Sequence, residues 1–325
     1  MRHIAAADVG GTHARFAIAA IDDGRVTELG EPVTVKTAEF ASFQHAWQEF
    51  GRRIDEPLPA ELAIAFAGPV GGDVLKLTNN PWVIRPALME EKLGVEQFVI
   101  VNDFAAIAHA VAGLDALAYR HVCGPKRDLP EDGVVSIVGP GTGLGVASLL
   151  RRSDGRHEVI ATEGGHIDWA PLDPLEDRIL HHMRENFRRV SVERLVSGRG
   201  LLNIYEALGT IENRPFTLRD EKDLWTAALS GSDTLAAAAL DRLCLIFGAA
   251  AGDYALAQGG QAVVLAGGLG LRLVDYLPRS GFRDRFIAKG RFERMMDEMP
   301  VKVIVHPQPG LFGAAAAFAS AHPDL

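Results

Sequence analysis

Glycine-rich turns that follow apolar runs are the first feature of this chain that could do chemistry. They occur at 10–12, 139–143 and 267–270. A glycine backbone can approach a phosphate closely and point its N–H groups at the oxygens, and a threonine hydroxyl adds a donor. One such turn alone is more often a tight hairpin without a ligand. Three at strand ends, the first preceded by Asp8, favour a nucleotide held by Gly10, Gly11, Thr12, Gly141, Thr142, Gly143, Gly267 and Gly268.

Two common nucleotide motifs are disfavoured. A Walker A loop needs Gly-Lys followed by Ser or Thr, and the chain contains neither tripeptide. A dinucleotide fingerprint needs three spaced glycines that open a helix. The run from Gly139 has Leu144 in place of the third glycine, and the residues after it look like a strand.

A carboxylate at the end of a predicted strand is the second chemical feature. Asp103 follows the apolar run 98–101 and precedes a helical stretch that begins near Ala105. Phosphoryl transfer to an alcohol needs a carboxylate near the attacking hydroxyl, together with Mg²⁺ and donors that neutralise the phosphates. The local sequence allows equally that Asp103 or Asn102 only caps the helix.

A third group of polar residues surrounds Glu163-Gly164-Gly165-His166. Two glycines bring the acid and the histidine close together, so that both could bind sugar hydroxyls. The alternatives are a surface turn for Glu163 and a structural role for His166, because no partner for a metal stands at a recognisable spacing. Glu193, taken alone, is typical of an acid in the first turn of a helix.

Strands and helices must position these residues. A strand, a glycine-threonine turn and a second strand occur twice, about 130 residues apart, which indicates an α/β architecture with two related halves. Helices are predicted over 172–208, with an interruption near 196–200, over 221–258 and in the Ala-rich terminal segment. Strands are predicted at 4–9, 14–20, 62–66, 98–101, 134–138, 144–150, 262–266 and 301–305. No long linker separates them, so two closely packed domains with a cleft are expected.

Composition and charge narrow the function further. The chain has 325 residues and a net charge of -9, which argues against a nucleic-acid partner. Its two cysteines, Cys123 and Cys244, are too few and too far apart for a zinc cluster, and we expect free thiols in a reducing compartment.

The N-terminus leads directly into a strand, so no signal peptide is expected. The apolar stretches 232–257 and 311–321 contain charges or are too short to span a bilayer. These features predict a cytoplasmic protein without a membrane partner.

The three glycine turns resemble those of a known superfamily. Asp8-Val9-Gly10-Gly11-Thr12 is similar to the first phosphate motif of the sugar kinase, actin and Hsp70 superfamily, and Gly139–Gly145 is similar to the second. Leu265-Ala266-Gly267-Gly268 is similar to its adenosine motif. The resemblance implies a two-domain actin-like ATPase (ribonuclease H-like) α/β fold with an interdomain cleft. The smaller domain would comprise 1–110 plus 309–325, and the larger one 111–308.

The polar groups make the resemblance more specific. Ile100–Phe104, Glu163–His166 and Val192–Gly198 stand in an order that resembles the bacterial ATP-dependent glucokinase family, in the group without a zinc motif. Supporting matches are Leu77-Thr78-Asn79-Asn80-Pro81-Trp82, Ser280–Phe282, Lys289–Phe292 and Pro309–Gly313. The similarity runs from about residue 4 to about residue 318. One departure is His13, where the family usually has asparagine, and it puts any specific contact at that position in doubt.

The resemblance implies a reaction and a role for each residue. The γ-phosphoryl group of ATP would pass to the 6-hydroxyl of D-glucose, giving glucose 6-phosphate for glycolysis. Asp103 would take the hydroxyl proton, and Asp8 would hold Mg²⁺ through water. The residues that would bind glucose are Asn102, Asp103, Glu163, His166 and Glu193. The family also suggests a homodimer.

Other functions lead to distinguishable expectations. A kinase for a related hexose or hexosamine would use the same mechanism. A sugar-sensing regulator would carry an N-terminal DNA-binding domain and a cysteine-rich zinc site near its sugar-binding histidine. Here the first phosphate motif starts at Asp8, and no cysteine is close to His166 in sequence. A chaperone-like ATPase would turn over ATP without regard to glucose.

Overall fold

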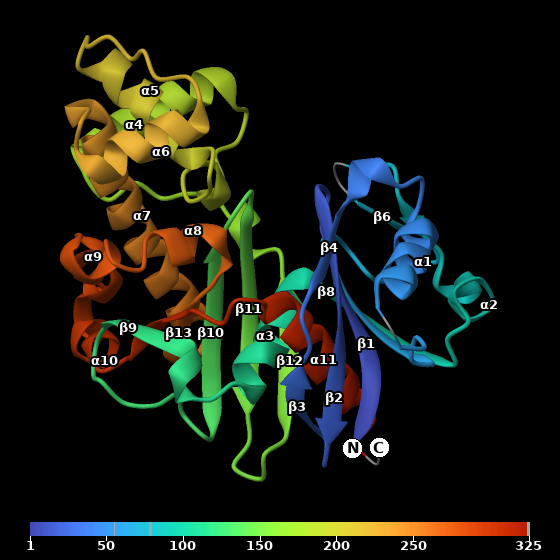
Figure 1. Ribbon diagram of the computed structural model, residues 1–325. Coiled ribbons are helices and arrows are strands. Elements are labelled where there is room, and N and C mark those ends of the chain that lie inside the picture. The colour runs from blue at the N-terminus through green and yellow to red at the C-terminus, as the bar shows by residue number, and fades with distance from the viewer. Residues whose placement is uncertain (55, 78–79, 324–325) are drawn as a thin grey trace. The chain divides into compact units, whose positions relative to one another are not determined.

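The computed structural model describes residues 1–54, 56–77 and 80–323 (Figure 1). Thr78 and Asn79, which contribute to the family resemblance, lie outside the described residues. The chain divides into two compact units. Unit 1 comprises Met1–Asp115, Val159–Ala161 and His306–Leu325, and unit 2 comprises Ala116–Glu158 and Thr162–Val305.

Unit 1 is built on a sheet with the order β3-β2-β1-β5-β8, in which β4 also pairs with β2. Strands β1 and β2 form an antiparallel hairpin, whereas β5 is parallel to β1 and β8 is parallel to β5. The carboxyl ends of β1, β5 and β8 therefore meet at one edge. The bounds are β1 Arg2–Val9, β2 His13–Asp22, β3 Arg25–Leu29, β4 Val33–Lys36, β5 Glu61–Phe66 and β8 Gln97–Asn102.

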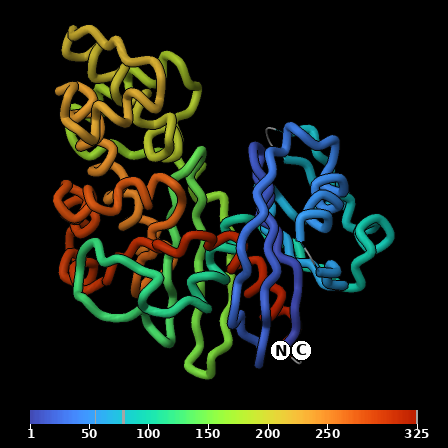
Figure 2. The backbone as a smooth tube through the Cα atoms, in the orientation of Figure 1, coloured from blue at the N-terminus to red at the C-terminus, as the bar shows by residue number. Residues whose placement is uncertain are grey.

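Helices cover both faces of this sheet because its strands are apolar on both sides. Ala5, Ala7 and Val9 of β1 pack in a core with α1 (Phe43–Arg53). Ile4 and Ala6 pack in a second core with α11 (Pro309–Ala321) and Ala106 of α3 (Asp103–Gly113). Figure 2 shows β1 and α11, which come from opposite ends of the chain, running together. The short elements β6 Leu75–Lys76, β7 Val83–Ile84 and α2 Met89–Leu93 complete the unit.

Unit 2 repeats this topology in the order β12-β11-β10-β13-β14-β9. Strands β10 and β11 form the hairpin, β13 is parallel to β10, and β14 is parallel to β13. This is the repeat that the recurring strand, turn and strand pattern predicts. The bounds are β9 Tyr119–Cys123, β10 Gly133–Pro140, β11 Leu144–Arg151, β12 His157–Thr162, β13 Gly260–Leu265 and β14 Val301–Ile304.

Helix α7 (Thr234–Gln258) is the central helix of unit 2 and packs on β10 and β13 as well as on α5 and α6 (Figure 1). Among the described residues it alone is long and apolar enough to cross a membrane, although its charges led us to expect otherwise. Of its most apolar window, 72% is buried inside the structure, as in the core helix of a globular unit. The other helices are α4 Pro174–Asn186, α5 Gly200–Ile211, α6 Glu221–Ser230, α8 Gly267–Arg272, α9 Phe282–Ile287 and α10 Glu293–Asp297.

Two boundaries near the predicted site differ from the sequence expectation. Helix α3 begins at Asp103, two residues before the predicted start, because Asn102 supplies the cap. The predicted turn at 267–270 is wrong: these residues form the first turn of α8, and only Gly267 has a positive φ, at 76°.

Candidate active site

The carboxyl edge of the unit 1 sheet gathers the predicted residues of that unit. Val9 pairs with Phe66 of β5, and Phe66 pairs with Asn102 of β8. Asp8 and Asn102 therefore lie at the same edge, two strand spacings apart, which corresponds to about 10 Å. Asp103 continues directly from this edge into α3.

Asp8 lies on the face of β1 that packs against α11. A Cβ atom added to Gly310, in the first turn of α11, would be 2.8 Å from Asp8 Oδ2, so the carboxylate is close to the start of this helix. Arg15, its partner on β2, donates to Oδ2 over 3.4 Å. Burial raises the pKa of the Asp8 carboxyl above its ordinary value, and Arg15 opposes the shift.

The first phosphate-type turn is held by residues that the motif does not include. Thr37 donates its hydroxyl to the carbonyl of Gly11 over 2.7 Å, and Asn80 Nδ2 donates to the same oxygen over 3.1 Å. The N–H of Thr37 also donates to the carbonyl of Thr12 over 3.0 Å. Because both carbonyls are engaged, the turn is fixed, and the side chain of Thr12 is exposed. Only the family resemblance pointed to Asn80, and no sequence signal pointed to Thr37.

The structure shows which of Asn102 and Asp103 caps α3. Asn102 Oδ1 accepts the N–H groups of Phe104 (2.9 Å) and Ala105 (3.3 Å), so Asn102 caps α3. Its Nδ2 donates to the carbonyl of Gly68 over 3.3 Å. Asp103 is the first residue of the helix, is partly buried and accepts the N–H of Phe104 over 3.0 Å. A carboxylate in the first turn is stabilised by the N-terminal end of the helix.

In unit 2 the second phosphate-type turn joins β10 to β11. Gly139 and Pro140 belong to the strand, so the turn itself is Gly141-Thr142-Gly143. Gly141 donates its N–H to the carbonyl of Gly143 over 2.8 Å, and Gly198 donates its N–H to the carbonyl of Gly141 over 2.8 Å. Thr142 is exposed at the tip.

Three predicted motifs of unit 2 meet at Leu144. Its N–H donates to Glu193 Oε2 over 2.8 Å. Its carbonyl lies against Gly165, where any Cβ would overlap the oxygen. The structure thus brings the second turn, the Glu163–His166 loop and Glu193 together. The side chains of Glu163 and His166 are exposed, and Glu193 is half-buried.

Tyr254 of α7 holds the Glu163–His166 loop in place through a hydrogen bond. Its hydroxyl donates to the carbonyl of Gly164 over 2.9 Å, and burial raises the pKa of Tyr254 well above its ordinary value. The sequence reasoning did not single out this residue, because a tyrosine within an apolar helix is typical of a core position.

The Tyr254→Phe variant is expected to raise the KM for glucose several-fold, up to about 10-fold, because one neutral hydrogen bond contributes about 0.5–1.5 kcal/mol. Steady-state kinetics with varied glucose measures this. Tyr205→Phe is the matched control, since the buried Tyr205 hydroxyl has no hydrogen-bond partner among the described residues. Equal KM values for the two variants would contradict a role for Tyr254 in holding the loop.

The third glycine pair lies beside the second turn. Strand β13 runs parallel to β10, and the N–H of Ala266 donates to the carbonyl of Val138 over 3.0 Å. A Cβ on Gly267 would be 2.5 Å from the carbonyl oxygen of Pro140, whereas a Cβ on Gly268 would meet nothing within 4 Å. Gly267 is therefore required by the fold, and Gly268 leaves space open.

Alanine substitutions distinguish the structural role of Gly267 from the proposed binding role of Gly268. Gly267→Ala is expected to cost about 1–3 kcal/mol and to lower Tm by several degrees, because φ is positive and the Cβ clashes. Gly268→Ala is expected to leave Tm unchanged and to raise the KM for ATP, since the methyl group would fill space that a phosphate or ribose needs. Thermal melts and ATP kinetics of both variants test this. Equal losses of Tm would show that Gly268 is structural as well.

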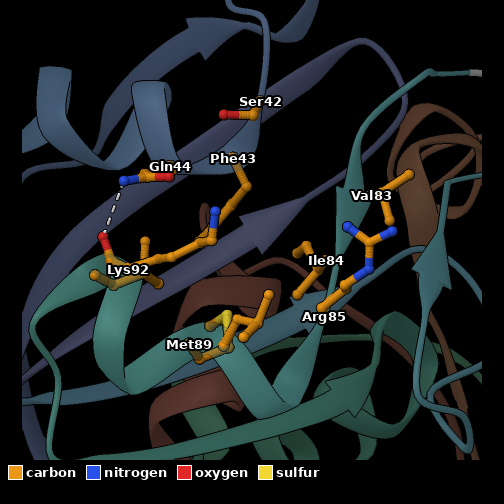
Figure 3. Close-up of a pocket in the computed structure, with 10 residues that line it drawn as sticks. Ser42, Phe43, Gln44, Val83, Ile84, Arg85, Met89 and Lys92 are labelled. Atoms are coloured by element: carbon orange, nitrogen blue, oxygen red, sulfur yellow. Dashed lines mark hydrogen bonds between the residues drawn. The ribbon is translucent and has the colours of Figure 1, made fainter.

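A pocket of about 170 Å³ in unit 1 is distinct from these residues (Figure 3). Helices α1 and α2 and strand β7 line it, and Gln44 Nε2 donates to the carbonyl of Lys92 over 3.1 Å across it. Its lining includes no predicted site residue.

Few groups in the described part of the chain are suited to binding a metal ion or to reacting as a thiol. No cluster of three or more His, Cys, Asp or Glu side chains there could hold a metal ion. Mg²⁺ often binds through only one or two carboxylates plus substrate phosphates, so Asp8 alone is compatible with it. Burial raises the pKa of Cys123 and of Cys244 to about 12, which makes both thiols poor nucleophiles.

Comparison with known proteins assigns the chain to a family. A family model described as Glucokinase matches residues 5–321. The chain belongs to the glucokinase family. A glucokinase from Zymomonas mobilis is 61% identical over 322 residues, which cover 99% of each chain. The predicted family is therefore confirmed, together with the prediction of a glucokinase, a phosphotransferase that acts on a sugar.

Solved structures confirm the predicted fold class. A glucokinase from an Antarctic psychrotroph has a TM-score of 0.86 and 30% identity, covering 98% of both chains. A ROK family glucokinase from Streptomyces griseus, in complex with glucose and AMPPNP, has a TM-score of 0.63 and 21% identity. It covers 97% of this chain and 99% of that chain, and at this identity the likeness shows the fold.

Proposed function

We propose that this chain transfers the γ-phosphoryl group of ATP to the 6-hydroxyl of D-glucose, giving glucose 6-phosphate and ADP. The observation that carries the proposal is the position of Asp103, in the first turn of α3 at the sheet edge that also bears Asp8. The Streptomyces griseus structure, with its glucose and AMPPNP, supports the choice of both substrates.

Asp103 is the proposed general base. Its partial exposure allows a hydroxyl to approach, and its place in the first turn of α3 holds it at the edge of the sheet. The carboxylate accepts the proton of the sugar 6-hydroxyl while the oxygen attacks the terminal phosphorus, and ADP leaves on the opposite side. Asn102 caps α3 through Oδ1, and its Nδ2 donates one hydrogen to the carbonyl of Gly68, so the second N–H of Nδ2 is the part available to the sugar.

The glycine turns are the proposed phosphate site. Backbone N–H groups of Gly11, Thr12, Thr142, Gly143, Gly267 and Gly268 would bind ATP oxygens, whereas the N–H groups of Gly10 and Gly141 are engaged within the turns that these residues shape. Asp8 would hold Mg²⁺ through water, which suits a partly exposed carboxylate beside a fixed turn. When bound, Mg²⁺ neutralises the charge on the phosphates.

Glu163, His166 and Glu193 are the proposed partners of the remaining glucose hydroxyls. Charged acceptors discriminate strongly between epimers, because a misplaced hydroxyl leaves a polar group unpaired. The predicted domain bounds, the homodimer and the cytoplasmic location stay part of this proposal.

A panel of hexoses and phosphoryl donors tests the proposal. The kcat/KM for glucose with ATP is expected to exceed the values for other hexoses and hexosamines, and for ADP or polyphosphate as donor. A higher value for another hexose would instead favour a kinase for a related sugar. ATP turnover that is independent of every sugar would indicate a chaperone-like ATPase.

A further inference from the structure

Glu193 lies against the second phosphate-type turn as well as in the proposed sugar site. Its Oε2 accepts the N–H of Leu144 over 2.8 Å. A Cβ placed on Gly143 would be 2.5 Å from the same oxygen, so the carboxylate sits directly on the backbone of the turn. Its Oε1 has no hydrogen-bond partner in the described part of the chain and is free for a ligand.

The segment that carries Glu193 holds both ends of this turn. Glu193 binds the end at Leu144, and the N–H of Gly198 donates to the carbonyl of Gly141 at the start over 2.8 Å. Between them, Leu195 and Val196 are fully buried, which makes the segment rigid. Trp225 Nε1 donates to the carbonyl of Gly198 over 3.2 Å and anchors the segment to α6.

We propose that Glu193 is a positioning residue for the nucleotide, which couples the acceptor sugar to the phosphate turn. This inference rests on the proposed function and adds a second role for the same carboxylate. Oε2 fixes the conformation of Gly141–Gly143, so that the N–H groups of Thr142 and Gly143 point at the phosphates, while Oε1 binds the sugar. A sugar that binds Oε1 then acts on a group that already holds the turn.

Nucleotide affinity in the absence of sugar separates this role from a sugar contact. The Kd for AMPPNP, in the presence of Mg²⁺ and without sugar, is measured by isothermal titration calorimetry. Glu193→Ala is expected to weaken binding about 10-fold or more, because a hydrogen bond to a charged group is lost. Glu193→Gln is expected to stay within about 3-fold of the unaltered chain, since its amide oxygen can still accept the N–H of Leu144.

Glu163→Ala is the matched control, because it removes an exposed acid of the proposed sugar site whose side chain makes no hydrogen bond or ion pair with the turn among the described residues. It is expected to raise the KM for glucose and leave the Kd for AMPPNP unchanged. An unchanged Kd for Glu193→Ala, or an equal loss in Glu163→Ala, would overturn the inference. If Glu193→Ala melts at a much lower temperature, its affinity cannot be interpreted and Glu193→Gln becomes the deciding variant. A 10-fold weaker binding of AMPPNP by folded Glu193→Gln would also contradict the inference. Because no sugar is present, failure of glucose phosphorylation would overturn only the proposed function.

Discussion

The Asp103→Asn variant is expected to phosphorylate glucose about 10²- to 10⁴-fold more slowly than the unaltered chain, the range typical of a lost general base. Asparagine keeps the shape of the side chain, and its oxygen can still accept the N–H of Phe104. The cap of α3 is unaffected because Asn102 supplies it. Glucose binding should therefore stay measurable, and the loss should fall on kcat.

The measurement combines kcat from a coupled assay with the Kd for glucose from calorimetry. Asp22→Asn is the control, since Asp22 is an exposed acid at the opposite end of the β1–β2 hairpin. It should leave kcat and Kd unchanged. Near-normal turnover in Asp103→Asn would remove Asp103 from the role of base.

The Asp8→Asn variant is expected to lower activity about 10- to 100-fold, the range for groups that hold a metal through a second shell. The loss should be relieved in part by high Mg²⁺, because the variant weakens metal binding. Titration of kcat/KM against Mg²⁺ concentration measures this. A variant with normal activity at low Mg²⁺ would contradict the proposed role of Asp8.

The same variant is expected to be more stable than the unaltered chain without ligands. Burial is the main reason why the pKa of Asp8 in the folded state is raised above 3.8. Ionisation of Asp8 at neutral pH therefore lowers the free energy of unfolding. This cost is absent below about pH 3.8, grows as the pH rises from there to the folded-state pKa, and is constant at higher pH. The difference in Tm between the variant and the unaltered chain should therefore be largest near pH 7.5 and narrow towards pH 4. A constant difference would show that Arg15 balances burial, and an inverted dependence on pH would show that Arg15 outweighs it.

Much of the sheet framework could be predicted from the sequence. Largely apolar runs at 4–9, 62–66 and 98–101 correspond to β1, β5 and β8. Strands β1 and β5 are largely buried on both faces and need no polar alternation, whereas β8 is half-buried. Strands β3 and β12 were missed because they are largely exposed, and neither carries more than three apolar residues in a row. Helix α1 was also missed, although Phe43, Ala46, Trp47 and Phe50 follow helical spacing and Ser42 caps it.

The motifs of the candidate site could be predicted from the sequence, but the residues that hold these motifs in place could not. Asp8 and the glycine turns could be identified from their residue types and spacing. Thr37, Tyr254 and the bond from Leu144 to Glu193 act through the backbone across distant parts of the chain. Any tyrosine or threonine can make such bonds, so only the fold reveals which ones do. The choice between Asn102 and Asp103 as the cap likewise needed the geometry of α3.

The most direct test of phosphoryl transfer to glucose is the identity of the product. NMR spectroscopy of a reaction of the protein with glucose, ATP and Mg²⁺ is expected to show one ADP for each glucose phosphorylated, with the phosphate on the 6-hydroxyl. Phosphate on a different hydroxyl, or ATP consumed with only inorganic phosphate released, would contradict this assignment.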